Sequence, residues 1–334
     1  MKPTRAMVLA AGLGTRMKPL SSLLPKPALP VVNRPLIVHC LEHLASHGVT
    51  FAVINTHHLA DQLEQAVSRH LPEGLEVKFS RENAILGTAG GLKKAAREFR
   101  HDTFYLVNSD SLTDADLTSA AAAHAASGRA ATMVVMPHEP GSGYRPVEVV
   151  GDDSRPTQRV SGIAGRRWGG GDLAPRTFIG IHLLEPSVLD SIPADAPCDI
   201  NAEVYPRMID KDPEAVGAWL HAGWWFEAGG PERYLDLNLQ MLARSGRGAV
   251  VGPGFFIDEE AHVERSIIGA RARLERKAVV EDCVIWDDVV VGEEVSLRRC
   301  IVTSGVTLPP LSPLTLERAI VMPGEDGGIR TEKM

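Results

Sequence analysis

Up to about residue 136, the chain alternates short apolar runs with segments in which apolar residues recur every three or four positions. The apolar runs predict strands at residues 6–10, 51–55, 75–80, 104–108 and 132–136. The segments between them predict helices at residues 36–46, 59–69, 88–99 and 116–126. Strands and helices in alternation indicate an α/β domain with a doubly wound, mostly parallel sheet.

The rest of the first two thirds of the chain is less regular. Residues 137–230 contain Gly- and Pro-rich connections and one clear predicted strand at 177–184, and we expect them to complete the sheet and form a second wall of the ligand cleft. A helix predicted at 236–243 leads to a boundary at residues 245–248, which read SGRG. Because ligands of such sheets bind beyond the carboxyl ends of the strands, the loops after residues 10, 80 and 108 are expected to carry the chemistry.

From residue 249 onward the hydrophobic pattern has a period of 17 residues. Four blocks start one period apart: AVVG at 249, SIIG at 266, CVIW at 283 and CIVT at 300. Two ladders of aliphatic residues keep the same step: Ile257, Leu274, Val291 and Leu308, and Val263, Val280 and Leu297. Three short strands per period, each with one inward aliphatic side chain, predict a parallel β-helix. Residues 316–322 repeat residues 297–303 at a step of 19, so we expect a two-residue insertion in the last coil.

Length and charge narrow the class of protein. The chain has 334 residues, which predicts about two domains, and we place them at 1–244 and 245–334. Lys and Arg number 35 against 42 Asp and Glu, a net charge of −7, whereas general nucleic-acid binders usually carry a basic excess. The longest apolar stretches, such as residues 6–11, fall far short of the ~20 residues that span a bilayer. We therefore expect neither a nucleic-acid nor a membrane partner.

Cysteine usage and the start of the sequence concern the cellular compartment. The four cysteines form no C-x-x-C motif, which indicates neither a zinc site nor a disulfide framework. No signal-peptide pattern precedes the first predicted strand. These features predict a cytoplasmic protein.

The first predicted strand runs into residues 9–20, which read LAAGLGTRMKPL. Glycines let backbone N–H groups wrap a polyphosphate, and Arg16 adds a planar guanidinium for phosphate oxygens, although glycine turns after strands are also common without function. The dinucleotide fingerprint needs three glycines and a later acidic residue, and neither it nor the P-loop ending Gly-Lys-Ser/Thr occurs here. Residues 24–29 read LPKPAL, so two prolines fix the backbone around Lys26.

Taken together, residues 9–29 closely resemble the signature of the sugar-1-phosphate nucleotidylyltransferases, the nucleotide-sugar pyrophosphorylases. The match continues through LGTAGG at 86–91, VNSD at 107–110 and WFEAGGPE at 225–232. Many members, notably mannose-1-phosphate guanylyltransferases, also carry a C-terminal left-handed β-helix. The resemblance covers nearly the whole chain and implies a Rossmann-like nucleotidyltransferase domain followed by that β-helix.

The resemblance implies a reaction in which an NTP and a sugar 1-phosphate give an NDP-sugar and pyrophosphate, with Mg²⁺, for which Mn²⁺ can substitute. A sugar-phosphate oxygen attacks the α-phosphorus while pyrophosphate leaves, so catalysis rests on positioning and charge neutralisation. By resemblance, Arg16, Lys26 and Asp110 are the catalytic residues. The 86–91 loop combined with a short β-helix makes GTP and mannose 1-phosphate the first expectation for the substrates.

Binding roles also come from the resemblance. Nucleotide contacts are expected at Leu9, Ala10, Ala11, Gly12, Gly14, Thr15, Arg16, Glu82, Leu86, Gly87, Thr88, Gly90, Asn108 and Asp110. The residues expected to line the sugar pocket are Tyr144, Glu148, Arg166, Gly180 and Asn201. Mg²⁺ is expected to bind the carboxylates of Asp110 and Glu227, because it prefers hard oxygen ligands and takes few carboxylates from a protein.

Three positions depart from the family pattern. Glu227 stands where Asp is usual, so its carboxylate reaches one methylene further. Ser109 stands where Gly is more usual and would add a side chain close to the nucleotide. The Glu-Lys-Pro segment that many members use on the sugar phosphate is missing, and residues 163–168 read IAGRRW. Either Arg166 or Arg167 supplies the lost positive charge, or both are solvated loop arginines.

These departures keep a second class of function open, a regulatory paralogue that binds nucleotide-sugar but turns it over poorly. A third class of function is acyl transfer by the β-helix. It generally needs more coils and a catalytic histidine, whereas His262 is the one histidine in residues 249–322. The open ends of a β-helix expose backbone groups that pair with other chains, so we expect a homo-oligomer formed through it. Cys283 and Cys300 occupy equivalent positions in successive coils and are expected to stack in its core.

Overall fold

The computed structural model describes residues 2–151, 157–194, 196–309, 314–324 and 328–334. By its internal contacts the chain forms two compact units. The first unit comprises Met1–Leu13 and Ile37–Phe226, and the second comprises Gly14–Leu36 and Glu227–Met334. The signature segment Gly14–Leu36 thus groups with the C-terminal part of the chain, although it precedes the predicted boundary at residue 245 by more than 200 positions.

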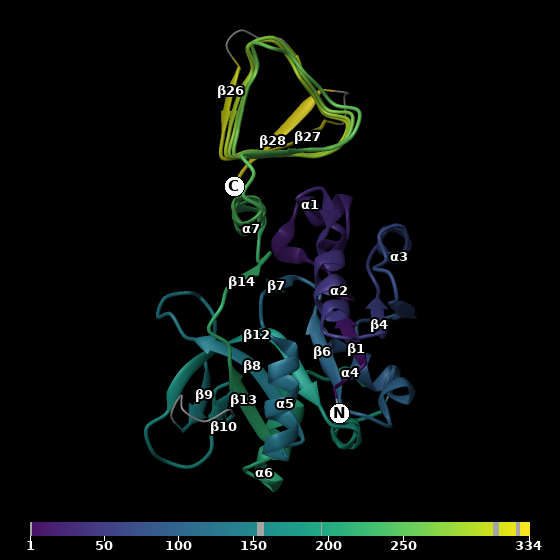
Figure 1. The fold of residues 1–334 in the computed structure, drawn as a ribbon, viewed down its shortest axis with the longest axis vertical. Helices are drawn as coiled ribbons and strands as arrows, with labels where there is room; N and C mark the ends of the chain where they lie inside the picture. Colours follow the sequence, from purple (N-terminus) through teal and green to yellow (C-terminus); the bar gives the residue numbers. More distant parts are fainter. Residues whose placement is uncertain (1, 152–156, 195, 310–313, 325–327) are drawn as a thin grey trace. The chain divides into compact units, whose positions relative to one another are not determined.

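The described residues of the first unit form a ten-stranded sheet with the main path β11-β10-β13-β8-β12-β6-β1-β4-β5 (Figure 1). Its parallel half contains β1 (Arg5–Leu9), β4 (Phe51–Thr56), β5 (Glu76–Arg81) and β6 (Phe104–Asn108). Leu9 at the end of β1 is in register with Asn55 and Asn108, so the carboxyl ends of three strands meet at one edge. This is the edge at which the sequence predicted the chemistry.

The other half of the sheet is mixed. It contains β8 (Ala131–Pro137), β9 (Val147–Val150), β10 (Gln158–Ile163), β11 (Arg166–Arg167), β12 (Ala174–Leu184) and β13 (Val216–Leu220). The long strand β12 runs antiparallel to both β6 and β8, while β13 is parallel to β8. The strand predicted at 177–184 lies within β12, and residues 137–230 complete the sheet as expected, but the other strands of this stretch were missed. The missed strands are short, and glycines such as Gly162 and Gly217 interrupt their apolar runs.

Helices cover this sheet close to their predicted bounds. They are α2 (Leu36–Ser46), α3 (Ala60–Arg69), α4 (Gly87–Lys94) and α5 (Leu117–Ser127). A further helix, α6 (Tyr205–Lys211), was not predicted from the sequence. The segment predicted as one helix at 88–99 ends as an α-helix at Lys94 and continues as a 3-10 turn, Ala96–Phe99. Asp116 is the N-cap of α5, because its carboxylate accepts hydrogen bonds from the Thr118 and Ser119 amides. No helix in the described ranges is long and apolar enough to cross a bilayer.

In the second unit the predicted repeat forms a parallel β-helix, seen end-on as a triangle in Figure 1. One face stacks β15 (Ala249–Val251), β18 (Ser266–Ile268), β21 (Val284–Ile285), β24 (Ile301–Val302) and β27 (Ala319–Pro323), followed by the antiparallel β28 (Ile329–Lys333). The second face stacks β16 (Phe256–Ile257), β19 (Arg273–Leu274), β22 (Val290–Val291) and β25 (Thr307–Leu308). The third stacks β17 (His262–Glu264), β20 (Val279–Glu281), β23 (Ser296–Arg298) and β26 (Thr315–Glu317).

The register confirms the period read from the sequence. Val263 pairs with Val280 and Val280 with Leu297 at steps of 17, while Leu297 pairs with Leu316 at a step of 19. Cys283 and Cys300 are buried free thiols in the core, as expected, and the Cys300 amide donates to Cys283 Sγ at 3.3 Å. Burial raises the pKa of the Cys283 thiol above its usual range.

The corners of the β-helix carry charged residues whose backbone has a positive φ, the left-handed conformation that favours glycine. Arg265 and Arg271 have φ of 43° and 55°, and Asp282 and Asp288, one coil later, have φ of 52° and 59°. A non-glycine residue there costs about 1–2 kcal/mol. Each corner pairs with the opposite charge in the next coil, with Arg265 Nε 2.7 Å from Asp282 Oδ1 and Arg271 Nε 2.6 Å from Asp288 Oδ1. Exposed ion pairs stabilise a fold only weakly, but these two also favour one register between successive coils.

The signature segment of the second unit packs on the long helix α7 (Pro231–Arg244) and on the β-helix. It contains a hairpin of β2 (Pro30–Val31) and β3 (Arg34–Pro35), whose turn residues Val32 and Asn33 have φ of 48° and 61°. Asn33 Nδ2 donates to the Ile268 carbonyl at 2.7 Å, and the Val32 amide donates to Asn238 Oδ1 at 2.9 Å. The hairpin is thereby fastened to the first coils and to α7.

Candidate active site

The end of β1 in the first unit is hydrogen-bonded to both neighbouring strands. The Ala10 amide donates to Asn55 Oδ1 at 2.7 Å. Ser109, directly after β6, donates to the Leu9 carbonyl through its amide at 3.2 Å and its hydroxyl at 2.6 Å. Ser109 is 3% exposed, so this departure from the family pattern places its hydroxyl against the protein's own backbone. Leu9, Ala10 and Asn108 thus lie together at the carboxyl edge of the sheet, and their contact with a nucleotide stays a prediction.

Glu82 connects that edge to the 86–91 loop. One carboxylate oxygen, Oε1, accepts a hydrogen bond from Asn55 Nδ2 at 2.7 Å, and the other, Oε2, accepts one from the Leu86 amide at 3.0 Å. Glu82 is 5% exposed. A chain of hydrogen bonds therefore runs from Ala10 through Asn55 and Glu82 to Leu86. Glu82 thus fixes the position of the loop through these hydrogen bonds. A direct contact of Glu82 with a nucleotide stays a prediction.

The 86–91 loop opens α4, which starts at Gly87. The Ala89 and Gly90 amides donate to the Cys198 carbonyl at 2.9 and 3.2 Å. Thr88 Oγ1 donates to Asp199 Oδ2 at 3.1 Å and accepts from the Ile200 amide at 2.8 Å. The predicted nucleotide loop is thus braced by a segment more than 100 residues later in the chain. Neither Cys198 nor Asp199 was among the predicted site residues.

Asp110 follows the end of β6 by two residues and is half-buried in a turn. Burial, together with the nearby Asp110 charge, raises the pKa of Cys40 to about 12. Gly180 of β12 has a φ of 87°, and a Cβ there would lie 3.0 Å from Ser111 Oγ and 3.1 Å from Asn108 Cβ. Gly180 thus permits a close approach of the protein's own groups, and its place in the sugar pocket stays a prediction.

Two buried polar atoms concern the predicted sugar pocket: one belongs to Asn201, and the other to Trp225, which lies beside Tyr144. The Tyr144 ring lies 5.1 Å, centroid to centroid, from that of Trp225 in β14 (Trp225–Glu227). Within the described ranges, Trp225 Nε1 and Asn201 Oδ1 are buried and have no hydrogen-bond partner. Buried polar atoms are usually paired, so one unused donor and one unused acceptor are compatible with a polar ligand. Trp225 belongs to a motif noted in the sequence, but nothing there indicated an unpaired Nε1.

Glu148, Arg166 and Arg167 form ion pairs at the β9–β11 end of the sheet. Arg167 Nε donates to Glu148 Oε2 at 2.6 Å. Arg166 Nη2 donates to both oxygens of Asp210, at 3.0 and 3.1 Å, and its guanidinium lies 5.0 Å from the ring centroid of Trp168. Both arginines are exposed. Their pairing with carboxylates neutralises the charge expected to replace the missing lysine, which favours the interpretation as solvated surface arginines.

The remaining predicted residues lie in the second unit. Gly14 has a φ of 61°, and a Cβ there would lie 3.2 Å from Lys26 Cβ, so glycine lets the turn Thr15–Met17 pack closely on Lys26. Arg16 is 72% exposed, and its Nη2 lies 3.6 Å from Oε1 of Glu227, whose side chain is only 12% exposed. Lys26 begins a 3-10 turn, Lys26–Ala28, directly after Pro25. Two cations predicted to bind phosphate and a predicted metal ligand therefore belong to the same compact unit.

An α/β unit with these loops, in a chain that ends in a β-helix, defines a nucleotide-transferring class of protein. Residues 5–244 match the family model described as Nucleotidyl transferase, and residues 243–318 match the model described as GlmU-like, C-terminal hexapeptide. The chain belongs to the Nucleotidyl transferase family and carries C-terminal hexapeptide repeats.

Curated relatives agree with this membership. The chain is 33% identical over 241 residues to a mannose-1-phosphate guanyltransferase of Schizosaccharomyces pombe, covering 69% of this chain and 62% of that protein. It is 30% identical over 325 residues to a probable mannose-1-phosphate guanylyltransferase 2 of Arabidopsis thaliana, covering 90% and 85%. A UTP–glucose-1-phosphate uridylyltransferase of Synechocystis is 33% identical over 220 residues, which is 62% of this chain and 55% of that protein.

The crystal structure of HddC from Yersinia pseudotuberculosis superposes with a TM-score of 0.59 at 21% identity. The superposition covers 71% of this chain and 99% of HddC, and it supports the fold.

Proposed function

We propose that this protein transfers a nucleotidyl group from an NTP to a sugar 1-phosphate, giving an NDP-sugar and pyrophosphate, with GTP and mannose 1-phosphate as its substrates. The observation that carries the reaction is the buried hydrogen-bond chain from Ala10 through Asn55 and Glu82 to Leu86, which fixes the two predicted nucleotide loops to one strand edge. The choice of substrates is supported by relatives named mannose-1-phosphate guanylyltransferase, one of which aligns with 90% of the chain.

The chemistry needs no general base. The phosphate of a sugar 1-phosphate is already largely ionised at pH 7, because the second pKa of a phosphate monoester is about 6. The task of the protein is to bring two anions together and to stabilise the charge of the departing pyrophosphate. We propose that the backbone amides of residues 9–12, 14 and 15 bind the triphosphate, and that Arg16 and Lys26 neutralise its charge.

We propose that Asp110 and Glu227 bind Mg²⁺, with Mn²⁺ able to replace it. The donor set fits, since both side chains offer hard carboxylate oxygens and Mg²⁺ uses only one or two carboxylates beside substrate phosphates. Glu227 presents Oε1 to Arg16, and its Oε2 is the proposed ligand atom. When bound, the ion would neutralise phosphate charge and orient the triphosphate.

For the sugar, we propose that Trp225 Nε1 donates to one hydroxyl group and Asn201 Oδ1 accepts from another. Both atoms are buried without a hydrogen-bond partner in the described part of the chain, and the Tyr144 ring packs beside Trp225. A sugar supplies hydroxyl groups that both donate and accept. Arg166 is the weakest member of the predicted pocket, because Asp210 already occupies its guanidinium.

A regulatory paralogue that binds nucleotide-sugar is the second candidate. The observation that favours it is the pairing of Arg166 and Arg167 with Asp210 and Glu148, which leaves the missing Glu-Lys-Pro lysine without an evident replacement. Pyrophosphate release, measured with five nucleoside triphosphates against a panel of sugar 1-phosphates, separates the two. Turnover that is fastest with GTP and mannose 1-phosphate supports the enzyme, whereas tight NTP binding without pyrophosphate release supports the regulator.

We further propose a homo-oligomer formed through the β-helix in the cytoplasm. The terminal strands β15, β16 and β17 each pair on one side only within the described sheets, so their outer edges offer unpaired backbone groups. The four cysteines are free, which agrees with a reducing compartment. Light scattering of the full chain should give a dimer or larger, and a chain ended at Arg247 should lose that mass; an unchanged assembly after truncation would refute the interface.

A further inference from the structure

One pair of residues on the outer surface of the β-helix breaks its pattern of opposite charges. At the corners, residues 17 positions apart carry opposite signs, as Arg265 and Asp282 do. On the third face, however, the register of β17 and β20 sets Glu264 directly opposite Glu281. Like charges facing each other on neighbouring strands destabilise a sheet. Arg265 and Arg298 each pair with one oxygen of these carboxylates, and a cation between the two remaining oxygens would relieve the repulsion that is left.

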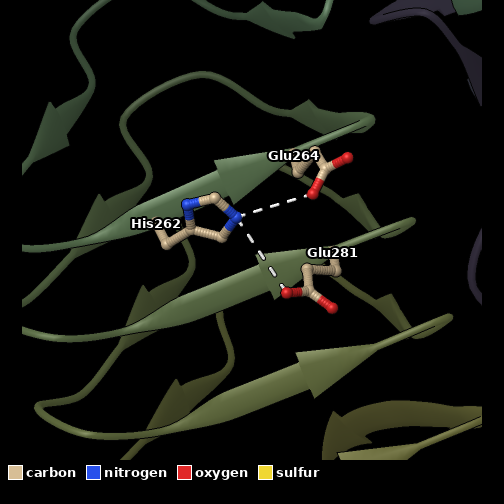
Figure 2. Close-up of side chains that lie close together, drawn as sticks. All are labelled: His262, Glu264 and Glu281. Carbon is tan, nitrogen blue, oxygen red and sulfur yellow. Dashed lines mark ion pairs between the residues drawn. The ribbon is translucent and has the colours of Figure 1, made fainter.

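A histidine completes the cluster. His262 lies two residues before Glu264, so its side chain is on the same face of β17. Its Nε2 lies 3.6 Å from Glu264 Oε2 and 4.0 Å from Glu281 Oε1, and the three ligand atoms all lie within 4.8 Å of one another. Figure 2 shows the imidazole and the two carboxylates pointing toward one another across the two strands.

Two arginines hold the carboxylates by their other oxygens. Arg265 Nη1 pairs with Glu264 Oε1, and Arg298 Nε lies 3.2 Å from Glu281 Oε2. The oxygens nearest His262 are the remaining pair, Glu264 Oε2 and Glu281 Oε1. Partners of this kind orient metal-binding carboxylates in protein sites. The arginines thus direct one oxygen from each coil toward the imidazole.

We propose that His262, Glu264 and Glu281 bind one divalent transition-metal ion of the zinc type on the outer face of the β-helix. One imidazole nitrogen and two carboxylate oxygens are ligands that zinc accepts, whereas Mg²⁺ and Ca²⁺ prefer oxygen ligands throughout. Bonds of about 2.0–2.1 Å at tetrahedral angles separate ligand atoms by roughly 3.3 Å. The observed separations, 3.6 and 4.0 Å from the imidazole and all within 4.8 Å, require the side chains to rotate inward, and these are 57%, 47% and 24% exposed.

The position suggests what the ion does. β17 is the terminal strand of its sheet and β20 is its neighbour, so an ion bound by all three residues joins the first coil to the second. This role is separate from the Mg²⁺ proposed for Asp110 and Glu227. It requires neither nucleotide nor sugar.

Zinc titration of the full chain by calorimetry, in the presence of millimolar Mg²⁺, tests the proposal. The variants are His262→Gln, Glu264→Gln and Glu281→Gln. The matched control is Glu317→Gln, which alters the same column of the third face without a neighbouring histidine. We expect the wild type and the control to bind one equivalent of Zn²⁺, and each of the three variants to bind it at least tenfold more weakly.

Thermal melting supplies an independent readout. Zn²⁺ should raise the melting temperature of the wild type relative to EDTA and leave that of His262→Gln unchanged, while both proteins melt cooperatively in EDTA. Co²⁺, used as a coloured probe, should give an absorption spectrum of low coordination number that is lost in the same variant. Absence of Zn²⁺ binding by the wild type overturns the proposal. The proposal is also overturned if His262→Gln binds one equivalent of Zn²⁺ with unchanged affinity. The same holds if Asp110→Asn, instead of the three variants, abolishes Zn²⁺ binding.

Discussion

Arg16 Nη2 lies 3.6 Å from Oε1 of Glu227, which joins a predicted phosphate ligand to a predicted metal ligand within one compact unit. The Glu227 side chain is largely buried, and the Arg16 guanidinium is mostly exposed. Removing the negative charge of Glu227 therefore affects two groups that the proposed reaction needs. This makes position 227 the most informative one for the departure from the family pattern.

Glu227→Gln should lower kcat/KM by on the order of 10²-fold, about as much as Asp110→Asn, because each removes a charged ligand from the proposed Mg²⁺ site. Glu227→Asp should keep at least part of the activity, since it restores the usual ligand of the family. Chelator should abolish turnover, and Mn²⁺ should support relatively more activity here than in relatives with Asp, because Mg²⁺ is stricter about geometry. Steady-state assays with each metal check this, and a near-wild-type Glu227→Gln enzyme with unchanged metal dependence would leave Asp110 as the only ligand.

Lys26→Ala should lower kcat by on the order of 10²–10³ while changing NTP affinity much less, because the ammonium acts on charge that develops in the transition state. Lys78→Ala is the matched control, since Lys78 forms a surface ion pair with Glu98 at 2.7 Å. Single-turnover kinetics and equilibrium NTP binding separate the two effects. If kcat stayed within a few-fold of wild type, Lys26 would be only a turn residue between prolines.

Trp225→Phe should raise the KM for the sugar 1-phosphate up to about tenfold and leave the KM for the NTP unchanged, because it removes one hydrogen-bond donor and keeps most of the ring packing against Tyr144. Trp219→Phe serves as the control, since the Trp219 ring stacks on His221. Equal effects on both KM values, or none on either, would contradict a sugar contact of Trp225 Nε1.

His182 should make the first unit sensitive to acid. Its side chain is buried, Nδ1 lies 2.8 Å from the Tyr205 hydroxyl, and burial lowers its pKa from 6.5 to about 3. Between these values the unfolded chain binds a proton that the folded chain does not, so the free energy of unfolding falls as the pH drops below 6.5. The free energy of unfolding at pH 5 is therefore about 2 kcal/mol lower than at pH 8.

Urea unfolding at a series of pH values measures this slope. His182→Gln should flatten it by about the same amount, whatever it does to stability at pH 8, and His70→Gln at an exposed position should not. An unchanged slope in His182→Gln would assign the acid sensitivity to other groups, such as His43, whose pKa burial lowers to about 4.

The sequence predicted best those elements whose burial is regular. The helix at 36–46 and the strand at 104–108 were predicted to the residue, because each has an uninterrupted apolar pattern. The β-helix was predicted together with the longer step of 19 residues in its last coil, because every coil repeats the same buried positions. The short strands β9, β10 and β13 were missed because bulges and glycines break their patterns, and nothing repetitive announces β28.

For the site, the motifs located the loops but not their supports. Asn55 becomes important only because the register of β1 and β4 brings it beside Leu9, which no local pattern encodes. Asp199 supports Thr88 from 111 residues away, through a fold that short-range periodicity does not determine. The partners of Arg166 and Arg167 likewise became evident only in three dimensions, and they changed the interpretation of both residues.

The hairpin that fastens Gly14–Leu36 to α7 and the first coils has a consequence for anyone who recombines these proteins. A chimera joined at residue 244 would graft a foreign β-helix beneath a native hairpin, and Asn33 would lose the Ile268 carbonyl unless the donor supplied an equivalent one. The Tyr234 hydroxyl of α7 would likewise lose the Trp286 Nε1 donor. The exchangeable part is therefore discontinuous: a crossover must carry residues 14–36 together with everything after residue 226.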